Sequence, residues 1–170
     1  MIVKVTNYDV QWASKFSVEA QNIQTVLGDE LVAIQHFGST SVPGMQAKPI
    51  IDMMPLVKEI EKVDLFNDQM VALGYEPLGE FGIKKRRYFR KGGDNRTHQI
   101  HMFQFDNTRE IDRHLAVRDY LWTHPGVAQQ YGDLKVKLAK QQHPEDKEAY
   151  IQGKDAFVKE LEIKALNWYS

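Results

Sequence analysis

One segment of the chain places a glycine and two hydroxyls between apolar runs, and then an acid inside the second run. Gly38, Ser39 and Ser41 follow LVAIQHF, and Asp52 lies within IIDMMPLV. Exposed N–H groups and short hydroxyls after a glycine can hold phosphate oxygens, because glycine lets an anion approach the main chain. An aspartate on a neighbouring strand can hold the divalent cation that phosphates need. The same residues permit a structural alternative, in which the glycines only form turns and Asp52 points outward from an edge strand.

Histidines on two nearby segments could complete a site around Asp52. His98 and His101 are three positions apart, so a regular strand points them to opposite faces and only one of them meets Asp52. A histidine beside an aspartate suits a borderline metal or a general base near neutral pH. We therefore predict Asp52 and His101 as catalytic residues, and Asp52, His101 and His36 as ligands of a divalent metal, either Mg²⁺, Mn²⁺ or Zn²⁺. The alternative is that each histidine is a hydrogen-bonded strand residue.

The segment KKRRYFRK, residues 84–91, is rich in cations although the chain as a whole is nearly neutral. On a strand, alternate side chains share a face, which puts Arg86 and Arg90 on one face and Arg87 on the other. Arg86 or Arg87, with Arg90, is predicted to point into the cleft and to bind phosphate or carboxylate. One alternative is an edge strand that its charges protect against pairing. Another, less favoured, is a surface for single-stranded nucleic acid, because aromatic residues interrupt the cations.

Other cations could reach the same ligand. Arg118 falls on the apolar stripe of an expected helix, where a guanidinium needs a partner. It either braces Asp119 or another acid, or it binds the ligand. Lys48, close after the glycine loop, is a further candidate for ligand binding. Lys135 and Lys154 could reach the cleft from the last helices, although lysines on helices are usually solvated.

Hydrophobic periodicity predicts the elements that would position these residues. The expected helices cover residues 10–27, 61–73 and 108–122, a segment from Pro125 and a segment from Pro144. The expected strands cover residues 31–37, 48–57, 82–90 and 97–105. Asp9 and Gly28 are the expected start and stop signals of the first helix. The fold class predicted is α+β (mixed α/β), in one domain of residues 1–170 that is strand-containing over 1–106 and helical over 107–170.

Composition excludes several classes of protein. Hydrophobic residues make up 42% of the 170-residue chain, charged residues 26%, and the net charge is −1, so no global field attracts nucleic acid or anionic lipid. The absence of cysteine excludes a disulfide scaffold, a thiolate nucleophile and a zinc site built on sulfur. Neither a signal-peptide pattern nor an apolar run of about eighteen residues is present. We therefore expect a cytoplasmic location and no membrane partner.

Six segments occur in the order typical of the GrpB family, and the chain resembles that family from about Tyr8 to Trp168. They are HFGSTSVPGMQAKPIIDMM, RRYFRK, THQIHMF, VRDYLWTHP, YGDLKVKLA and YIQGKDAFV. The loop with its Lys-Pro-Ile-Ile-Asp continuation is much more specific than a lone Gly-Ser. The resemblance implies a nucleotidyltransferase-like fold: a small mixed sheet with flanking helices, the Gly-Ser loop after one strand and the acid on the next. It implies a fold and a candidate site, but no particular reaction.

The chain departs from the wider nucleotidyltransferase-like superfamily at the acids. That superfamily carries Asp-x-Asp or Asp-x-Glu, whose two carboxylates emerge on one face of a strand. Here Met54 stands at the second position, and a thioether is a poor ligand for Mg²⁺. The later strand that usually supplies a third acid offers His98 and His101. Trp122 stands where the family usually has an arginine, which removes one cationic contact.

These observations lead to three expectations about function. The first is a nucleotidyltransferase-like protein that binds a phosphorylated small molecule or nucleotide. If it is catalytic, an acceptor hydroxyl attacks the α-phosphate and pyrophosphate leaves, with metal and arginines stabilising the charge. The second is a non-catalytic nucleotide- or phosphate-binding module with a degenerate metal site. The third is a metal-dependent phosphohydrolase that uses Asp52 and the histidines.

Overall fold

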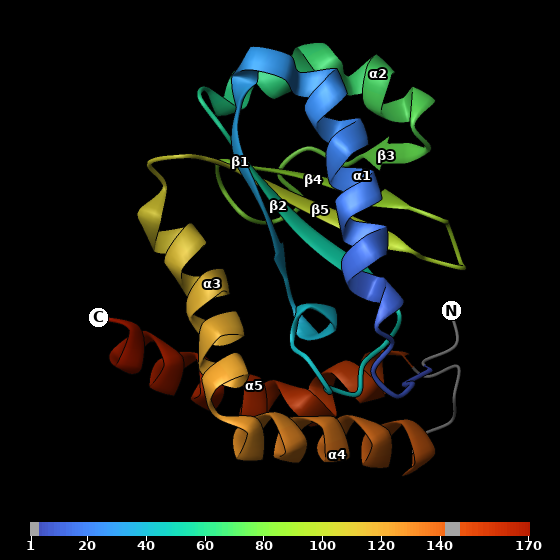
Figure 1. The fold of residues 1–170 in the computed structure, drawn as a ribbon, viewed down its shortest axis with the longest axis vertical. Helices are drawn as coiled ribbons and strands as arrows, with labels where there is room; N and C mark the ends of the chain where they lie inside the picture. Colours follow the sequence, from blue (N-terminus) through green and yellow to red (C-terminus); the bar gives the residue numbers. More distant parts are fainter. Residues whose placement is uncertain (1–3, 142–146) are drawn as a thin grey trace.

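The computed structural model describes residues 4–141 and 147–170, which form a five-stranded sheet with flanking helices (Figure 1). The helices are α1 (Gln11–Leu27), α2 (Asn67–Ala72), α3 (Thr108–Thr123), α4 (Pro125–Gln141) and α5 (Lys147–Tyr169). The strands are β1 (Leu31–Phe37), β2 (Ile51–Val57), β3 (Tyr75–Pro77), β4 (Arg86–Lys91) and β5 (His98–Gln104). Short 3₁₀ helices are η1 (Gly28–Glu30), η2 (Ser39–Ser41) and η3 (Ile60–Phe66). The predicted mixed α+β class is confirmed.

Most predicted elements are present, and the differences have local causes. The expected helix at 61–73 begins as the 3₁₀ helix η3 and becomes α-helical at Asn67. Strand β3 was not predicted, because three residues are too few to show an alternating pattern. Strand β4 begins at Arg86 instead of residue 82, since Lys85 has a φ of 64° and breaks the extended chain. The predicted start of the last helix at Pro144 lies outside the described residues.

The strand order places both strands of interest inside the sheet. The order is β1-β2-β5-β4-β3, with β2 and β5 parallel and the other neighbours antiparallel. Strand β2, which carries Asp52, lies between β1 and β5, and the basic strand β4 lies between β5 and β3. Both alternatives that invoked an edge strand are therefore wrong.

The two faces of the sheet bury different clusters. Ile51 and Met53 face α1 and α2 in the largest core, whereas Met54 faces the other way and packs with Phe37, Phe103 and α3. Asp52 alternates with Ile51 and Met53, so it shares the face of Met54. A third cluster joins the segment after β1 to α3, α4 and α5. Figure 1 shows η2, just after β1, between the end of the sheet and the pair α4 and α5. None of the described helices is long and apolar enough to cross a membrane.

Candidate functional site

A small cavity opens where the loop after β1 meets β2, β5, α4 and α5. Its volume is about 150 Å³. Its lining includes Ser39, Thr40, Lys48, Asp52, Gln99, Lys135, Tyr150 and Lys154. Pockets for whole small molecules measure roughly 300–1,000 Å³. This cavity therefore suits the charged end of a ligand whose remaining part lies outside.

Gly38 brings the loop against the acid, as the sequence predicted. Its φ is 73°, and a Cβ atom built there would lie 2.6 Å from Asp52 Oδ2, so only glycine fits. The hydroxyl of Ser41 donates to the carbonyl oxygen of Gly38 at 2.6 Å, and the buried Thr40 donates to the carbonyl oxygen of Ile50 at 3.2 Å. These bonds fix the loop beside β2 and leave Ser39 on the cavity wall. Ser41 itself serves the loop and does not line the cavity.

Lys135 is the most unusual residue of the cavity. It comes from α4, is only 2% exposed, and its Nζ donates to Ser39 Oγ at 2.8 Å. Burial, reinforced by the positive charges of Lys154 and Lys48, lowers the pKa of Lys135 from 10.5 to about 7. Burial also lowers the pKa of Lys154, while the charge of Asp52 opposes that shift. Within residues 4–141 and 147–170 the cavity thus holds three amines and one carboxylate, an excess of positive charge that favours an anion.

Two tyrosines support these lysines. Lys135 Nζ lies 4.4 Å from the ring centroid of Tyr131, and Lys154 Nζ lies 5.4 Å from that of Tyr150. Such cation–π contacts orient an ammonium group without neutralising it. The hydroxyl of Tyr150 is buried and has no hydrogen-bond partner among the described residues. Burial raises the pKa of Tyr150, so this hydroxyl keeps its proton and can donate to a ligand oxygen.

His101 faces Asp52, and His98 points to the opposite face, as the strand alternation predicted. His101 Nε2 lies 3.5 Å from Asp52 Oδ1, and His101 Nδ1 lies 3.3 Å from Arg86 Nη1. Because arginine can only donate, Nδ1 is the acceptor and a neutral ring carries its proton on Nε2. Nε2 is buried without a hydrogen-bond partner within the described part of the chain. This geometry suits a hydrogen-bond donor at Nε2 better than the general base expected from the sequence.

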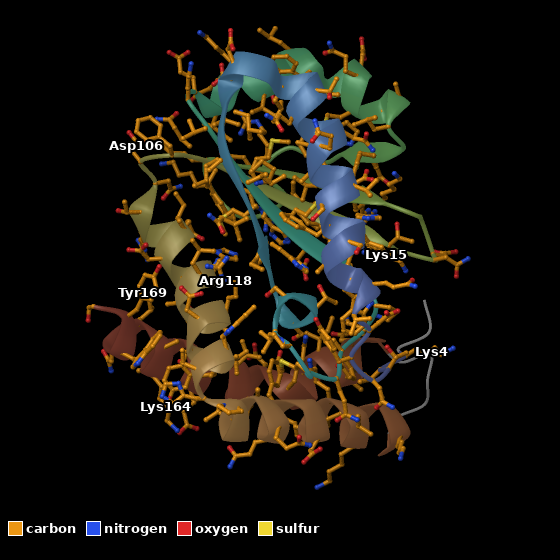
Figure 2. All side chains as sticks on the ribbon, viewed as in Figure 1. Lys4, Lys15, Asp106, Arg118, Lys164 and Tyr169 are labelled. Carbon is orange, nitrogen blue, oxygen red and sulfur yellow. The ribbon has the colours of Figure 1, made fainter. Side chains whose placement is uncertain are left out.

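Two candidates from the sequence brace the loop instead of lining the cavity. His36 stacks on Phe16 of α1 and contacts Thr40 Oγ1 at 3.0 Å, and burial lowers its pKa to about 4. It does not join Asp52 and His101, because it alternates to the other face of the sheet. Arg118 bonds to Asp119 at 2.8 Å, to Gln35 Oε1 at 2.9 Å and to the carbonyl of His36 at 3.2 Å. Figure 2 shows Arg118 on the side of α3 that faces β1. These contacts are of the kind that the bracing alternative describes.

The arginines of β4 do not enter the cavity. Arg86 is 6% exposed and donates to the carbonyl oxygens of Glu80 and Phe81 at 3.2 and 2.9 Å. Arg87 points to the opposite face and pairs with Asp64 at 2.8 Å. Arg90 shares the face of Asp52 but pairs with Glu76 at 3.3 Å. The prediction that these arginines bind phosphate in the cleft therefore fails geometrically, because each already has protein partners and none lines the cavity.

The donor atoms do not fit a divalent metal. Among the described residues, Asp52 is the one carboxylate on the cavity wall, and the position of a second acid is Met54, which is fully buried against Phe37 and Phe103. Three lysines around Asp52 would repel a cation. No group of three or more His, Asp or Glu side chains able to hold a metal occurs within residues 4–141 and 147–170. The predicted ligand set of Asp52, His101 and His36 is not brought together.

The sequence carries a signal for the burial of the two helical lysines. Tyr131 and Lys135 are four residues apart on α4, and Tyr150 and Lys154 are four residues apart on α5. Residues four apart lie on one helix face, so a lysine that follows a buried tyrosine at this spacing is itself drawn inward. Lys48 was a predicted ligand residue, and it does line the cavity.

The fold and the cavity define a class: a mixed α+β protein with a lysine-rich cavity at a Gly-Ser loop. The chain belongs to the GrpB family, since the family model described as GrpB protein matches residues 2–164. A crystal structure of the conserved protein GrpB from Enterococcus faecalis is 49% identical, with a TM-score of 0.94 over 98% of this chain and 99% of that chain.

Two curated relatives differ in length from one another. The UPF0157 protein YqkA of Bacillus subtilis (strain 168) is 49% identical over 98% of this chain, which covers 48% of that protein. The glutamate-rich protein GrpB of Alkalihalophilus pseudofirmus is 32% identical over 94% of this chain, which covers 93% of that protein. The chain thus spans about half of YqkA and nearly all of the second relative.

Proposed function

We propose that the cavity binds the phosphate end of a small phosphorylated molecule or nucleotide, and that it does so without a metal ion. The observation that carries this proposal is the convergence of Lys48, Lys135 and Lys154 on a single carboxylate beside the Gly-Ser loop. Burying amines is unfavourable unless something compensates their charge. Asp52 supplies one negative charge, and a bound phosphate would supply the rest.

Each group has a distinct part in holding the phosphate. The three ammonium groups would neutralise its oxygens, and charge-assisted bonds of this kind are among the strongest that proteins make. The hydroxyls of Ser39 and Tyr150 would donate to oxygens that the lysines do not reach. The Nε2 proton of His101 would meet an oxygen near Asp52. Lys135 would bind in its charged form, so an anion raises its pKa and draws in a proton at neutral pH.

Nucleotidyl transfer and phosphohydrolysis stay predictions. As predicted from the sequence, both reactions would use a divalent metal; without one, the lysines and His101 would have to stabilise the developing charge on the reacting phosphate. A nucleotidyl transfer would release pyrophosphate only when an acceptor hydroxyl is present. A hydrolase would release phosphate with no acceptor. The binding module would release neither.

Calorimetric titration of tripolyphosphate in the presence of EDTA tests the proposal. The wild type should bind, and Lys154→Met should weaken binding by about 10- to 100-fold, the loss of one hydrogen bond to a charged group. Lys159→Met is the matched control, because Lys159 is on the same helix, 75% exposed, and pairs with Asp155. It should bind like the wild type.

Two results would reject the proposal. One is binding that appears only when Mg²⁺ or Mn²⁺ replaces EDTA, which would restore the metal site. The other is an equal loss in Lys154→Met and Lys159→Met, which would place the anion on the general surface of α5. Circular dichroism of both variants confirms that they are folded.

A further inference from the structure

An exposed aromatic ring lies beside the face of the sheet that carries Asp52. Phe81, in the turn before β4, stacks on Tyr88 with ring centroids 5.0 Å apart and planes 12° apart. The guanidinium carbon of Arg90 lies 5.8 Å from the centroid of Phe81. These contacts still leave 54% of Phe81 exposed. A flat ring that is supported from below and open to solvent is a platform on which another ring can stack.

The backbone at Phe81 has a conformation that is unusual for a bulky residue. Phe81 has a φ of 47°, in the left-handed region that bulky residues rarely adopt. The guanidinium of the buried Arg86 donates to the carbonyl oxygen of Phe81 at 2.9 Å, and Tyr88 N donates to the carbonyl oxygen of Gly79 at 2.7 Å. Glycine would relieve the backbone strain, but it would remove the ring that stacks on Tyr88. Strain of this kind, kept at an exposed residue, points to function.

A continuous series of side chains connects the platform to the cavity. The Tyr88 ring meets the His101 ring edge-on at 5.2 Å between centroids, and His101 Nε2 lies 3.5 Å from Asp52 Oδ1. Arg90, which contacts the Phe81 ring, is paired in the sheet with Gln99 of β5, and Gln99 lines the cavity. Arg90 and Gln99 therefore connect the platform to the wall of the cavity, and Arg90 supplies a positive charge between them.

We propose that the ligand carries a flat aromatic ring, as a nucleotide does, and that this ring stacks on Phe81 while the phosphates enter the lysine cavity. This inference rests on the proposed phosphate site and adds the class of molecule that the site takes. The cavity alone is too small for more than the charged end of the ligand. Sequence-independent stacking on an aromatic side chain, with arginine nearby, is how proteins hold bases without reading their edges.

The test compares ATP with tripolyphosphate, both in EDTA, by calorimetry. For the wild type, ATP should bind more tightly than tripolyphosphate. Phe81→Ala and Phe81→Leu should each weaken ATP binding by about tenfold, the typical effect of losing one stacked base, and leave tripolyphosphate binding unchanged. Phe81→Trp should keep the affinity for ATP. Phe105→Ala is the control, because Phe105 is also half exposed, at 51%, and follows the far end of β5.

The outcomes separate the two proposals. If tripolyphosphate binds to the wild type and Phe81→Leu binds ATP as the wild type does, the stacking inference is overturned while the phosphate site stands. Equal affinity of the wild type for ATP and tripolyphosphate overturns it as well. If neither probe binds to the wild type, both proposals fail. Thermal melts show whether Phe81→Ala is folded, and Phe81→Leu, which keeps an apolar side chain, serves if it is not.

Discussion

Replacing Lys135 by methionine should remove a specific pH dependence of stability. In the folded protein burial lowers the pKa of Lys135 from 10.5 to about 7. Between these two values the unfolded chain binds a proton that the folded chain does not. The free energy of unfolding of the wild type therefore rises with pH in this window, and below pH 7 the full penalty of charging a buried amine remains. Lys135→Met has no such group and should lack this rise.

The size of the effect follows from a single proton. One proton changes the free energy of unfolding by about 1.4 kcal/mol per pH unit. From pH 7.5 to pH 9.5 the free energy of unfolding of the wild type should therefore rise by about 2.5 kcal/mol relative to that of Lys135→Met. This is somewhat less than one full proton would give, because near both ends of the range the folded and unfolded states differ by less than one bound proton. All other titrating groups are shared by the two proteins, so their contributions cancel in the difference.

Urea unfolding of both proteins at three or four pH values between 7 and 10 measures this difference. Lys137→Met, an exposed lysine two residues further on α4, is the control and should follow the wild type at every pH. A stability difference between Lys135→Met and the wild type that stays constant over this range would show that Lys135 keeps its ordinary pKa. The proposal that burial keeps the Lys135 amine largely uncharged until an anion binds would then be refuted.

Three further predictions follow from the same geometry. Gly38→Ala should lower the free energy of unfolding in urea clearly more than Gly44→Ala. Both glycines have a φ above 70°, which costs alanine about 1–2 kcal/mol of backbone strain. Of the two, only Gly38 would place its Cβ against a carboxylate, 2.6 Å from Asp52 Oδ2. Equal costs would mean that the loop stands away from Asp52. Met54→Asp should destabilise by about 3 kcal/mol or more, because Met54 is fully buried; a stable variant with new Mg²⁺ binding would contradict the packing of this position. At pH 8, tripolyphosphate binding should draw close to one proton onto Lys135, and at pH 6 almost none, because the pKa of Lys135 is about 7. The uptake is measured at each pH from the dependence of the calorimetric heat on the ionisation enthalpy of the buffer, and uptake that is the same at both pH values would exclude Lys135 as the group that charges.

The part of the fold that depends on local patterns could be predicted from the sequence. Alternation and helical spacing are local properties, and they located β1, β2, α1 and α3. Gly28 ended α1 as predicted, with a φ of 54°. The turn before β4 was missed because its course depends on Phe81 and Lys85, two residues in left-handed conformations that propensity does not favour there.

The candidate site was predicted only where its residues are close in the sequence or share a sheet face. Gly38, Ser39, Asp52 and His101 come together as expected, because the loop and two neighbouring strands position them. The arginines of β4 looked like ligand residues, but Arg86 donates to a carbonyl oxygen of the turn before β4, and Arg87 pairs with Asp64 on the other face of the sheet. Which partner an arginine side chain meets depends on the tertiary structure, so it could not be read from the strand pattern.

Helix packing could not be derived from one sequence. Lys135 and Lys154 enter the cavity because α4 and α5 pack across the end of the sheet, where Figure 1 shows them below η2. A helical stripe indicates which face is buried, but it does not indicate what that face is packed against. For the same reason Arg118 could be recognised as needing a partner, although Gln35 could not be named as one.

The central claim is that the lysine cavity beside Asp52 binds phosphate oxygens without a metal. A crystal soaked with tungstate, a tetrahedral oxyanion with a strong anomalous signal, tests it most directly, with a second crystal soaked in Mn²⁺. We expect a tungstate peak within hydrogen-bonding distance of Lys135, Lys154 and Ser39, and no Mn²⁺ peak at Asp52. A Mn²⁺ ion on Asp52 and His101, with the oxyanion bound elsewhere, would contradict the account.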